Sequence, residues 1–306
     1  MRKIPVIVGL VASLVILFGR APTSSAQDAP LSSAEKVATR GVVFQVEGKD
    51  GGEIWLAGSV HMLRANDYPL PVTYEEAYGL ANQIVFEIPP SELQSPEAMA
   101  IIQRSILYPD GTTLKDHLSS ENYEKVVTFL KTSGMAMEQV QMLKPWMLGQ
   151  LIGLQEFTKQ GFKPELGLDL YFETKAAKDK KQVKGLETVE FQMGLFGNLP
   201  ASQQEELLVS SLDDFDDAKE FITSLMSAWK SGDTEKVAEV MNEGMEDDPA
   251  LAKALLLDRN VNWVKPIEEF LKSKTPTLVI VGAGHLCGKG SVVELLQKNG
   301  HKVTQH

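Results

Sequence analysis

Residues 277–285 read TLVIVGAGH, and this stretch decides the fold. An apolar run without polar alternation, ended by small residues, is typical of a strand that is buried on both faces. The Gly-Ala-Gly that follows lets another chain or a ligand approach the backbone closely. His285 then stands where the strand ends, which is the edge of an α/β sheet at which ligands bind. We therefore expect a buried strand that presents His285 to a site.

The same pattern occurs near the other end of the chain, where residues 53–61 read EIWLAGSVH. Both copies run from a strand into Gly-x-x-His. The chain has only five histidines, so two in matched settings point to a common role. We expect His61 and His285 to face one cleft, although either could instead be a structural histidine at a turn.

Two carboxylates occupy comparable positions. Glu87 is embedded in the apolar run 84–88, and Glu187 lies between the expected strand 182–186 and a helix that starts near residue 189. A buried carboxylate is costly unless it is paired or bound to a metal. Two imidazoles and two carboxylates are ligands that suit a divalent transition metal. The sequence thus indicates a metal site made of His61, His285, Glu87 and Glu187.

Arginine is rare after residue 26, with four positions in all: Arg40, Arg64, Arg104 and Arg259. Arginine is preferred where a planar fork must hold a carboxylate. Arg259 lies beside Asn260 on an expected helix that also carries Trp263, and this setting favours a role in the site. For Arg64, three residues after His61, a site role and an ordinary surface ion pair stay open. Cys287, two residues past His285, is expected to be a buried, inert residue, with a soft metal ligand or a reactive thiol as the alternatives.

The first 26 residues have the pattern of a signal peptide. Arg2 and Lys3 precede an apolar run over residues 4–18, and Ser24-Ser25-Ala26 provides small residues for cleavage before Gln27. A retained membrane anchor is the alternative, although the run is shorter than the roughly 20 residues that a span needs. We therefore expect an exported protein, either periplasmic or secreted.

The net charge of the chain limits which kinds of partner it is expected to bind. The chain has a net charge of −11, and the loss of residues 1–26, with three cations and no acid, makes it −14. So acidic a protein is not expected to bind nucleic acid, nor a membrane beyond the export signal. A peptide or a small molecule is the expected substrate, and the sequence indicates no oligomeric state.

The remaining pattern predicts one α/β domain over residues 27–306. Its mixed β-sheet core comes from the N- and C-terminal parts, and a large helical insertion over about residues 95–275 separates them. The expected strands share short apolar runs bounded by turn residues: 42–46, 54–57, 84–88, 182–186, 277–281 and 301–304.

Taken together, these motifs resemble the TraB/GumN family, which is related to the Tiki proteases and to the erythromycin esterase/ChaN-like superfamily. Five motifs carry the resemblance: GSVH at 58–61, VFE at 85–87, LET at 186–188 with Gln192, RN at 259–260 with Trp263, and VGAGHL at 281–286. They cover about residues 38–305.

The resemblance implies a hydrolase, and specifically a divalent-metal-dependent peptidase with Mn, Co or Zn; together with the N-terminal pattern, we expect an exported hydrolase. It implies His61, His285 and Glu87 as metal-binding or catalytic residues, with Glu187 and Arg259 as further residues of the site. The expected metal ligands are His61, His285, Glu87 and Glu187. The expected catalytic residues are Glu87, His61 and Arg259. No other cofactor is implied. Two alternatives stay open: a non-catalytic protein that binds metal, haem or peptide, and a metal-independent, esterase-like hydrolase with His61 as base.

Overall fold

A computed structural model describes residues 40–109, 111–212, 215–243 and 249–306. The expected signal peptide, residues 1–26, lies outside the described residues. In the described part of the chain, no helix is both long and apolar enough to cross a membrane.

Six strands form one mixed sheet in the order β4-β3-β5-β2-β1-β6. The strands are β1 (Val43–Glu47), β2 (Glu53–Ser59), β3 (Gln83–Phe86), β4 (Gln182–Gly185), β5 (Thr277–Gly282) and β6 (Lys302–Gln305). The four strands β4, β3, β5 and β2 run parallel, while β1 is antiparallel to β2 and to β6. The predicted α/β class and mixed sheet are confirmed.

β5, the strand that ends in the second Gly-x-x-His segment, lies in the middle of this sheet. All of β3 is buried, and so is β5 up to its last residue, so both faces of the sheet are covered there. Parallel strands covered on both faces consist of nearly continuous apolar residues, which explains why these segments show no alternation.

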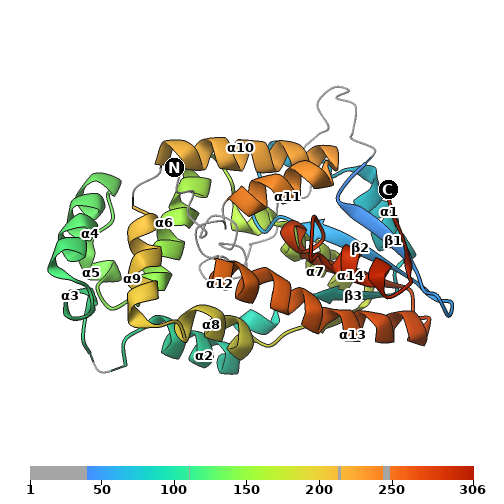
Figure 1. The fold of residues 1–306 in the computed structure, drawn as a ribbon, viewed down its shortest axis with the longest axis horizontal. Helices are drawn as coiled ribbons and strands as arrows, with labels where there is room; N and C mark the ends of the chain where they lie inside the picture. The colour runs from blue at the N-terminus through green and yellow to red at the C-terminus, as the bar shows by residue number, and fades with distance from the viewer. Residues whose placement is uncertain (1–39, 110, 213–214, 244–248) are drawn as a thin grey trace.

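Helices surround the sheet and extend well beyond it (Figure 1). In chain order they are α1 (Val72–Leu80), α2 (Pro96–Ile106), α3 (Leu114–His117), α4 (Ser120–Ser133), α5 (Met137–Val140), α6 (Pro145–Lys159), α7 (Leu168–Asp179), α8 (Val189–Gly197), α9 (Ala201–Ser210), α10 (Phe215–Ser231), α11 (Thr234–Glu243), α12 (Pro249–Ala252), α13 (Asp258–Ser273) and α14 (Val292–Lys298). A π-helix (Lys253–Leu257) joins α12 to α13, and a short 3-10 helix (Ala283–His285) follows β5.

The inserted region is helical except for one strand. Helices α3, α4, α5, α6 and α9 lie at the end of the molecule remote from the sheet (Figure 1). β4, however, returns from the middle of the insertion and pairs in parallel with β3. The sheet therefore combines strands from three parts of the chain, not from its two ends alone.

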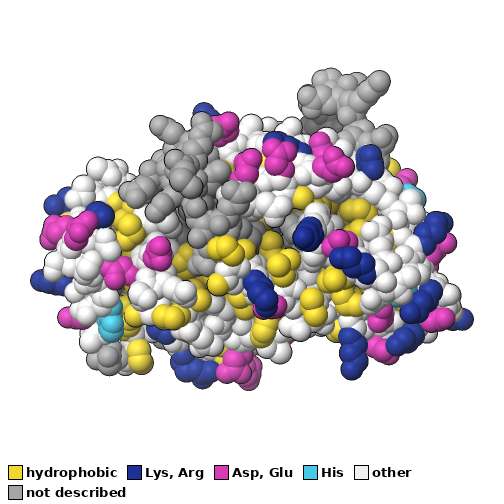
Figure 2. Space-filling model, in the orientation of Figure 1, with side chains coloured by type: hydrophobic (Ala, Val, Ile, Leu, Met, Phe, Trp, Pro, Cys, Tyr) yellow, Lys and Arg dark blue, Asp and Glu magenta, His cyan; other side chains and the backbone are white. Residues whose placement is uncertain are grey.

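The face shown in Figure 2 has acidic and basic side chains interspersed around a central area of hydrophobic ones. The large hydrophobic side chains exposed in the protein include Phe191 on α8, Leu257 at the end of the π-helix and Val261 on α13.

Candidate active site

Four predicted site residues follow the C-terminal ends of four neighbouring parallel strands. Glu187 follows β4, Glu87 follows β3, His285 follows β5 and His61 follows β2. Parallel strands end at the same edge of a sheet, so their following residues converge there. The parallel register of β2 with β5 pairs Ser59 with Gly282, which places both Gly-x-x-His segments at one level of the sheet.

Arg259 binds the two glutamates from α13. Its Nη2 donates to Glu87 Oε2 at 2.5 Å and to Glu187 Oε2 at 2.8 Å, and its Nε donates to Glu187 Oε1 at 2.9 Å. Its Nη1 donates to the Leu255 carbonyl at 3.2 Å and lies 3.1 Å from His285 Nε2. A guanidinium has five N–H donors, and each of them here has an acceptor.

The π-helix contributes to this placement. A π-helix frequently occurs at functional sites, because its wider turn changes the backbone pairing within a helix. Leu255 lies inside the π-helix and Arg259 follows two residues after it. The Leu255 carbonyl accepts from Arg259 Nη1 and so helps to fix the guanidinium, whose side chain is 2% exposed.

Further donors hold the carboxylates. The Gly282 backbone N–H donates to Glu87 Oε1 at 2.8 Å, and the Trp263 indole donates to Glu187 Oε1 at 2.8 Å. Burial by itself raises the pKa of Glu87, but Arg259 first, then the two imidazoles and the Gly282 N–H, hold that pKa far below its ordinary value. Burial lowers the pKa of Arg259, and the two glutamates more than compensate, so it stays charged.

His285 is held as a neutral imidazole. Asn260 Nδ2 donates to the Gly290 carbonyl at 2.9 Å, so its Oδ1 faces His285 Nδ1, at 2.6 Å. Nδ1 therefore carries the proton, and Nε2 accepts from Arg259. Burial, and then the charge of Arg259, lower the pKa of His285 to about 3.

His61 is held differently, by a carboxylate that the sequence analysis missed. His61 Nδ1 lies 2.8 Å from Asp169 Oδ2, and the two side chains are 11% and 7% exposed. Burial has the largest single effect and lowers the pKa of His61, but the charge of Asp169, the contact with its carboxylate and the charge of Glu87 together outweigh burial and raise that pKa above its ordinary value. His61 Nε2 makes no hydrogen bond with any residue that the structure describes.

Asp169 reaches His61 because α7 begins against the His61 backbone. Leu168 N donates to the Val60 carbonyl at 3.1 Å, and a Cβ on Gly167 would lie 2.0 Å from the His61 carbonyl oxygen. Glycine is therefore required at the start of α7. The available signal in the sequence was a carboxylate at helical spacing with the apolar residues Leu168 and Phe172 of α7, a face on which Glu173 is buried as well.

The two histidines meet in front of Gly282. A Cβ on Gly282 would stand 3.4 Å from Glu87 Oε1, 3.5 Å from His285 Cδ2 and 3.9 Å from His61 Nε2. These three side chains therefore surround one point, and glycine leaves that point open. Arg64 is not among them, because it pairs with Asp67 at 3.0 Å and lies over the Phe162 ring.

The expected divalent metal does not fit these side chains as they are arranged. Arg259 and Gln192 take Glu87 Oε2, Gly282 takes Glu87 Oε1, both oxygens of Glu187 are engaged, and the His285 Nε2 lone pair faces Arg259. Among the described residues, no group of three or more His, Cys, Asp or Glu side chains is arranged to hold a metal ion. The centre of the cluster is a guanidinium.

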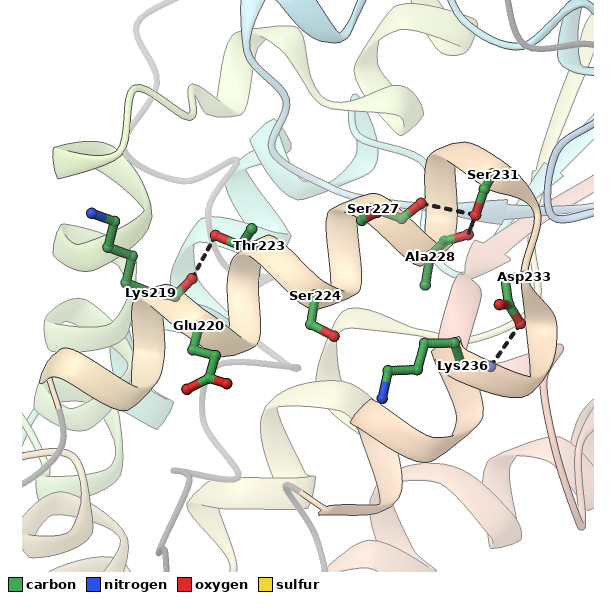
Figure 3. A pocket seen from close by; sticks show the side chains of 9 residues that line it. All are labelled: Lys219, Glu220, Thr223, Ser224, Ser227, Ala228, Ser231, Asp233 and Lys236. Carbon is green, nitrogen blue, oxygen red and sulfur yellow. Dashed lines mark hydrogen bonds between the residues drawn. The ribbon is translucent and has the colours of Figure 1, made fainter.

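A groove between α10 and α11 is lined by residues other than those of this cluster (Figure 3). It has a volume of about 540 Å³ and is lined mainly by polar side chains. The Thr223 and Ser231 hydroxyls donate to carbonyls of their own helix, and Asp233 accepts from the Lys236 backbone N–H. These groups are satisfied locally, and the groove contains no catalytic set.

The sequence also matches known proteins. The TraB/PrgY/gumN family matches residues 42–305. The chain belongs to this family. Relatives within it are distant: "Uncharacterized protein YbaP" of Escherichia coli K12 is 22% identical over 79% of this chain and 87% of its own length. "Metalloprotease TIKI1" of Danio rerio is 24% identical over 81% of this chain and 60% of its own length. No solved structure matches significantly.

Proposed function

We propose that this protein is a hydrolase that cleaves peptide bonds, with His61 as the general base. Membership in the family and the similarity to a protein named as a metalloprotease support hydrolysis. The observation that carries the proposal is the His61–Asp169 pair, in which Nδ1 lies 2.8 Å from the carboxylate while Nε2, beside the open point at Gly282, makes no hydrogen bond with the described residues.

This geometry suits the activation of water. With its proton on Nδ1, neutral His61 accepts a proton from water at Nε2 while the water oxygen attacks the substrate carbonyl carbon. When the C–N bond breaks, Nε2 returns that proton to the leaving amine. Asp169 orients the ring and stabilises its protonated form, as the third member of a triad does. A general base of this kind contributes about 10²- to 10⁴-fold in rate.

Arg259 acts in this proposal through the residues that it holds. It fixes Glu87 and Glu187, and with its five donors engaged it has none free for a substrate oxygen. Burial first, and then the charge of Arg259, keep His285 neutral. In this proposal Arg259 is therefore a positioning residue, in place of the direct role in the chemistry that the resemblance implies.

A second candidate is a divalent-metal-dependent peptidase, and the similarity to the Danio rerio metalloprotease favours it. A Mn, Co or Zn ion at His61, His285 and Glu87 would compete with Arg259 for His285 Nε2 and for Glu87. The two candidates differ in the expected effect of a chelator: a metal-dependent peptidase loses its activity, and a metal-independent one keeps it.

A peptide-library cleavage screen tests the proposal. The purified protein is assayed in EDTA and, separately, with added Mn, Co or Zn, beside His61→Gln and a surface control, Glu121→Gln. We expect cleavage in EDTA that Glu121→Gln keeps and His61→Gln loses. Cleavage only with added metal would establish the second candidate, and absence of cleavage throughout would leave a binding protein instead of an enzyme.

We also propose that the protein acts outside the cytoplasm. The support is the positively charged start, the apolar run over residues 4–18 and the Ser-Ser-Ala that ends it. A periplasmic or secreted hydrolase meets peptides that have left the cell or have come from outside.

A further inference from the structure

Gln192 on α8 is fixed between the two glutamates of the site. Its side-chain amide nitrogen donates to Glu87 Oε2 at 3.2 Å and to Glu187 Oε2 at 2.9 Å. An ionised carboxylate only accepts hydrogen bonds, so the NH₂ group must face the glutamates. The amide oxygen, Oε1, must therefore face the other way.

That oxygen is buried, and none of the described residues donates a hydrogen bond to it. Gln192 is 4% exposed, and its Oε1 accepts no hydrogen bond from the part of the chain that the structure describes. An unsatisfied buried acceptor costs about 1–3 kcal/mol. A side chain held in this orientation by the two glutamates of the site is suited to a donor that arrives with a ligand.

Helix α6, which contacts α8, also carries buried polar side-chain atoms without a partner among the described residues. Trp146 Nε1 and Gln150 Oε1 on α6 are also buried and unpartnered among the described residues. The Trp146 ring stacks on Phe196 at 5.4 Å between centroids, and Phe196 lies one helical turn beyond Gln192 on α8. Unpartnered polar atoms thus occur on both helices of this contact.

We propose that Gln192 Oε1 accepts a hydrogen bond from a backbone N–H of the substrate, next to the bond that is cleaved. This inference rests on the proposed hydrolase activity and specifies its substrate class. An amide provides the N–H that the buried oxygen lacks, whereas an ester oxygen in the same place provides no donor and leaves Oε1 unsatisfied. Sites with such buried groups discriminate strongly against analogues without the matching donor.

An N-methyl scan tests this hydrogen bond. The probe is the peptide that the wild-type protein cleaves fastest in the library, with each backbone N–H methylated in turn, plus the analogues with an ester at each position. Values of kcat/KM are measured for the wild type, Gln192→Met, Gln192→Asn and the control Gln204→Met. Gln204 is also a buried glutamine, but on α9 it donates to Leu199 O and does not touch the cluster.

We expect one position at which methylation or ester replacement lowers kcat/KM about 10-fold or more in the wild type and in Gln204→Met. The same change should cost less than about 2-fold in Gln192→Met and Gln192→Asn, because the acceptor is removed or withdrawn. Comparing analogues within each variant separates this hydrogen bond from any general loss of activity. If Gln192→Met does not fold, Gln192→Asn keeps the amide and gives the same comparison.

Two results would overturn the inference. If the Gln192 variants show the wild-type pattern at every position, Oε1 is satisfied by an internal water and does not read the substrate. If the wild type cleaves no peptide at all, the proposed function fails together with this inference. Cleavage without coupling to Gln192 overturns the inference alone.

Discussion

Glu87 is surrounded by donors, and the strongest of them is a cation of the protein itself. Arg259 Nη2 lies 2.5 Å from its Oε2 and both side chains are almost fully buried. Replacement by glutamine keeps the shape but removes the negative charge, and it turns an N–H group towards either Arg259 or the Gly282 N–H. Breaking a buried ion pair in this way costs about 3–5 kcal/mol.

Glu87→Gln should therefore lower the free energy of unfolding by several kcal/mol in urea melts with EDTA present. Glu121→Gln is the control, because that exposed glutamate pairs with the exposed Lys125 one helical turn away, and its loss should change stability by about 0.5 kcal/mol or less. An unchanged melt together with a lost metal affinity would instead identify Glu87 as a metal ligand.

Cys287 gives a second prediction at the scale of one residue. It follows His285 closely but is 6% exposed, and burial, with a smaller effect of the Asp233 charge, raises the pKa of its thiol to about 12. The thiolate is the reactive form, so the native thiol should not react with a disulfide reagent at pH 8 over an hour. It should react at once in urea. Rapid labelling of the native protein would show that the segment after β5 opens readily.

At the scale of elements, the end of β5 determines how much room the site has. Gly282 has φ −49° and ψ 135°, which alanine also adopts, and a Cβ there would make no contact shorter than 3.4 Å. That Cβ would stand in front of His61 Nε2 and fill the open point of the site. The fold should accept the substitution, while the water that His61 activates should be displaced.

Gly282→Ala should thus lower kcat/KM by about 10-fold or more, with a change in unfolding free energy of about 1 kcal/mol or less. Gly79→Ala on α1 is a matched control: its Cβ meets nothing within 4 Å, so stability should stay equal or rise and activity should not change. Equal activity of both variants would show that the reaction takes place elsewhere.

The elements also show what could be predicted from the sequence. A strand that ends in Gly-x-x-His is a local pattern, so the convergence of His61 and His285 followed from two parallel strands. The pairing of Glu87 with Arg259 depends on a helix 172 positions away and on a π-helix, which the Leu-rich segment before Asp258 does not reveal. Asp169 was missed because its contact with His61 comes from the packing of α7 on residues 60–61, which is a tertiary effect.

At the scale of the whole molecule, the sequence defined the central strands better than the boundaries of the insertion. The central strands are continuous apolar runs, and such runs can be recognised as buried strands from the sequence. β4 was predicted as a strand, but it is a short edge strand whose residues are mostly exposed, so its composition does not show that the insertion contributes it to the central sheet. Yet β4 is the strand that delivers Glu187 to Arg259.

At the scale of the whole molecule, the proposed export predicts where the mature protein begins. If residues 1–26 are a signal peptide, the protein recovered from the periplasm or the medium should begin at Gln27. N-terminal sequencing checks this directly. A chain that begins at Met1 and sediments with the membrane would instead support a retained anchor.

The central claim is that His61, oriented by Asp169, is the base of a hydrolase that needs no metal. The most direct test is the pH dependence of kcat/KM for peptide cleavage in EDTA, for the wild type and for Asp169→Asn. The base form of His61 exists above its pKa, so activity should rise with pH through a midpoint above 6.5, the ordinary value. Asp169→Asn should move this midpoint to lower pH, because Glu87 still raises the pKa but Arg259 and burial lower it. It should also reduce kcat/KM by about 100-fold or more. Activity that EDTA abolishes and Mn, Co or Zn restores, with the same midpoint in both proteins, would contradict the claim.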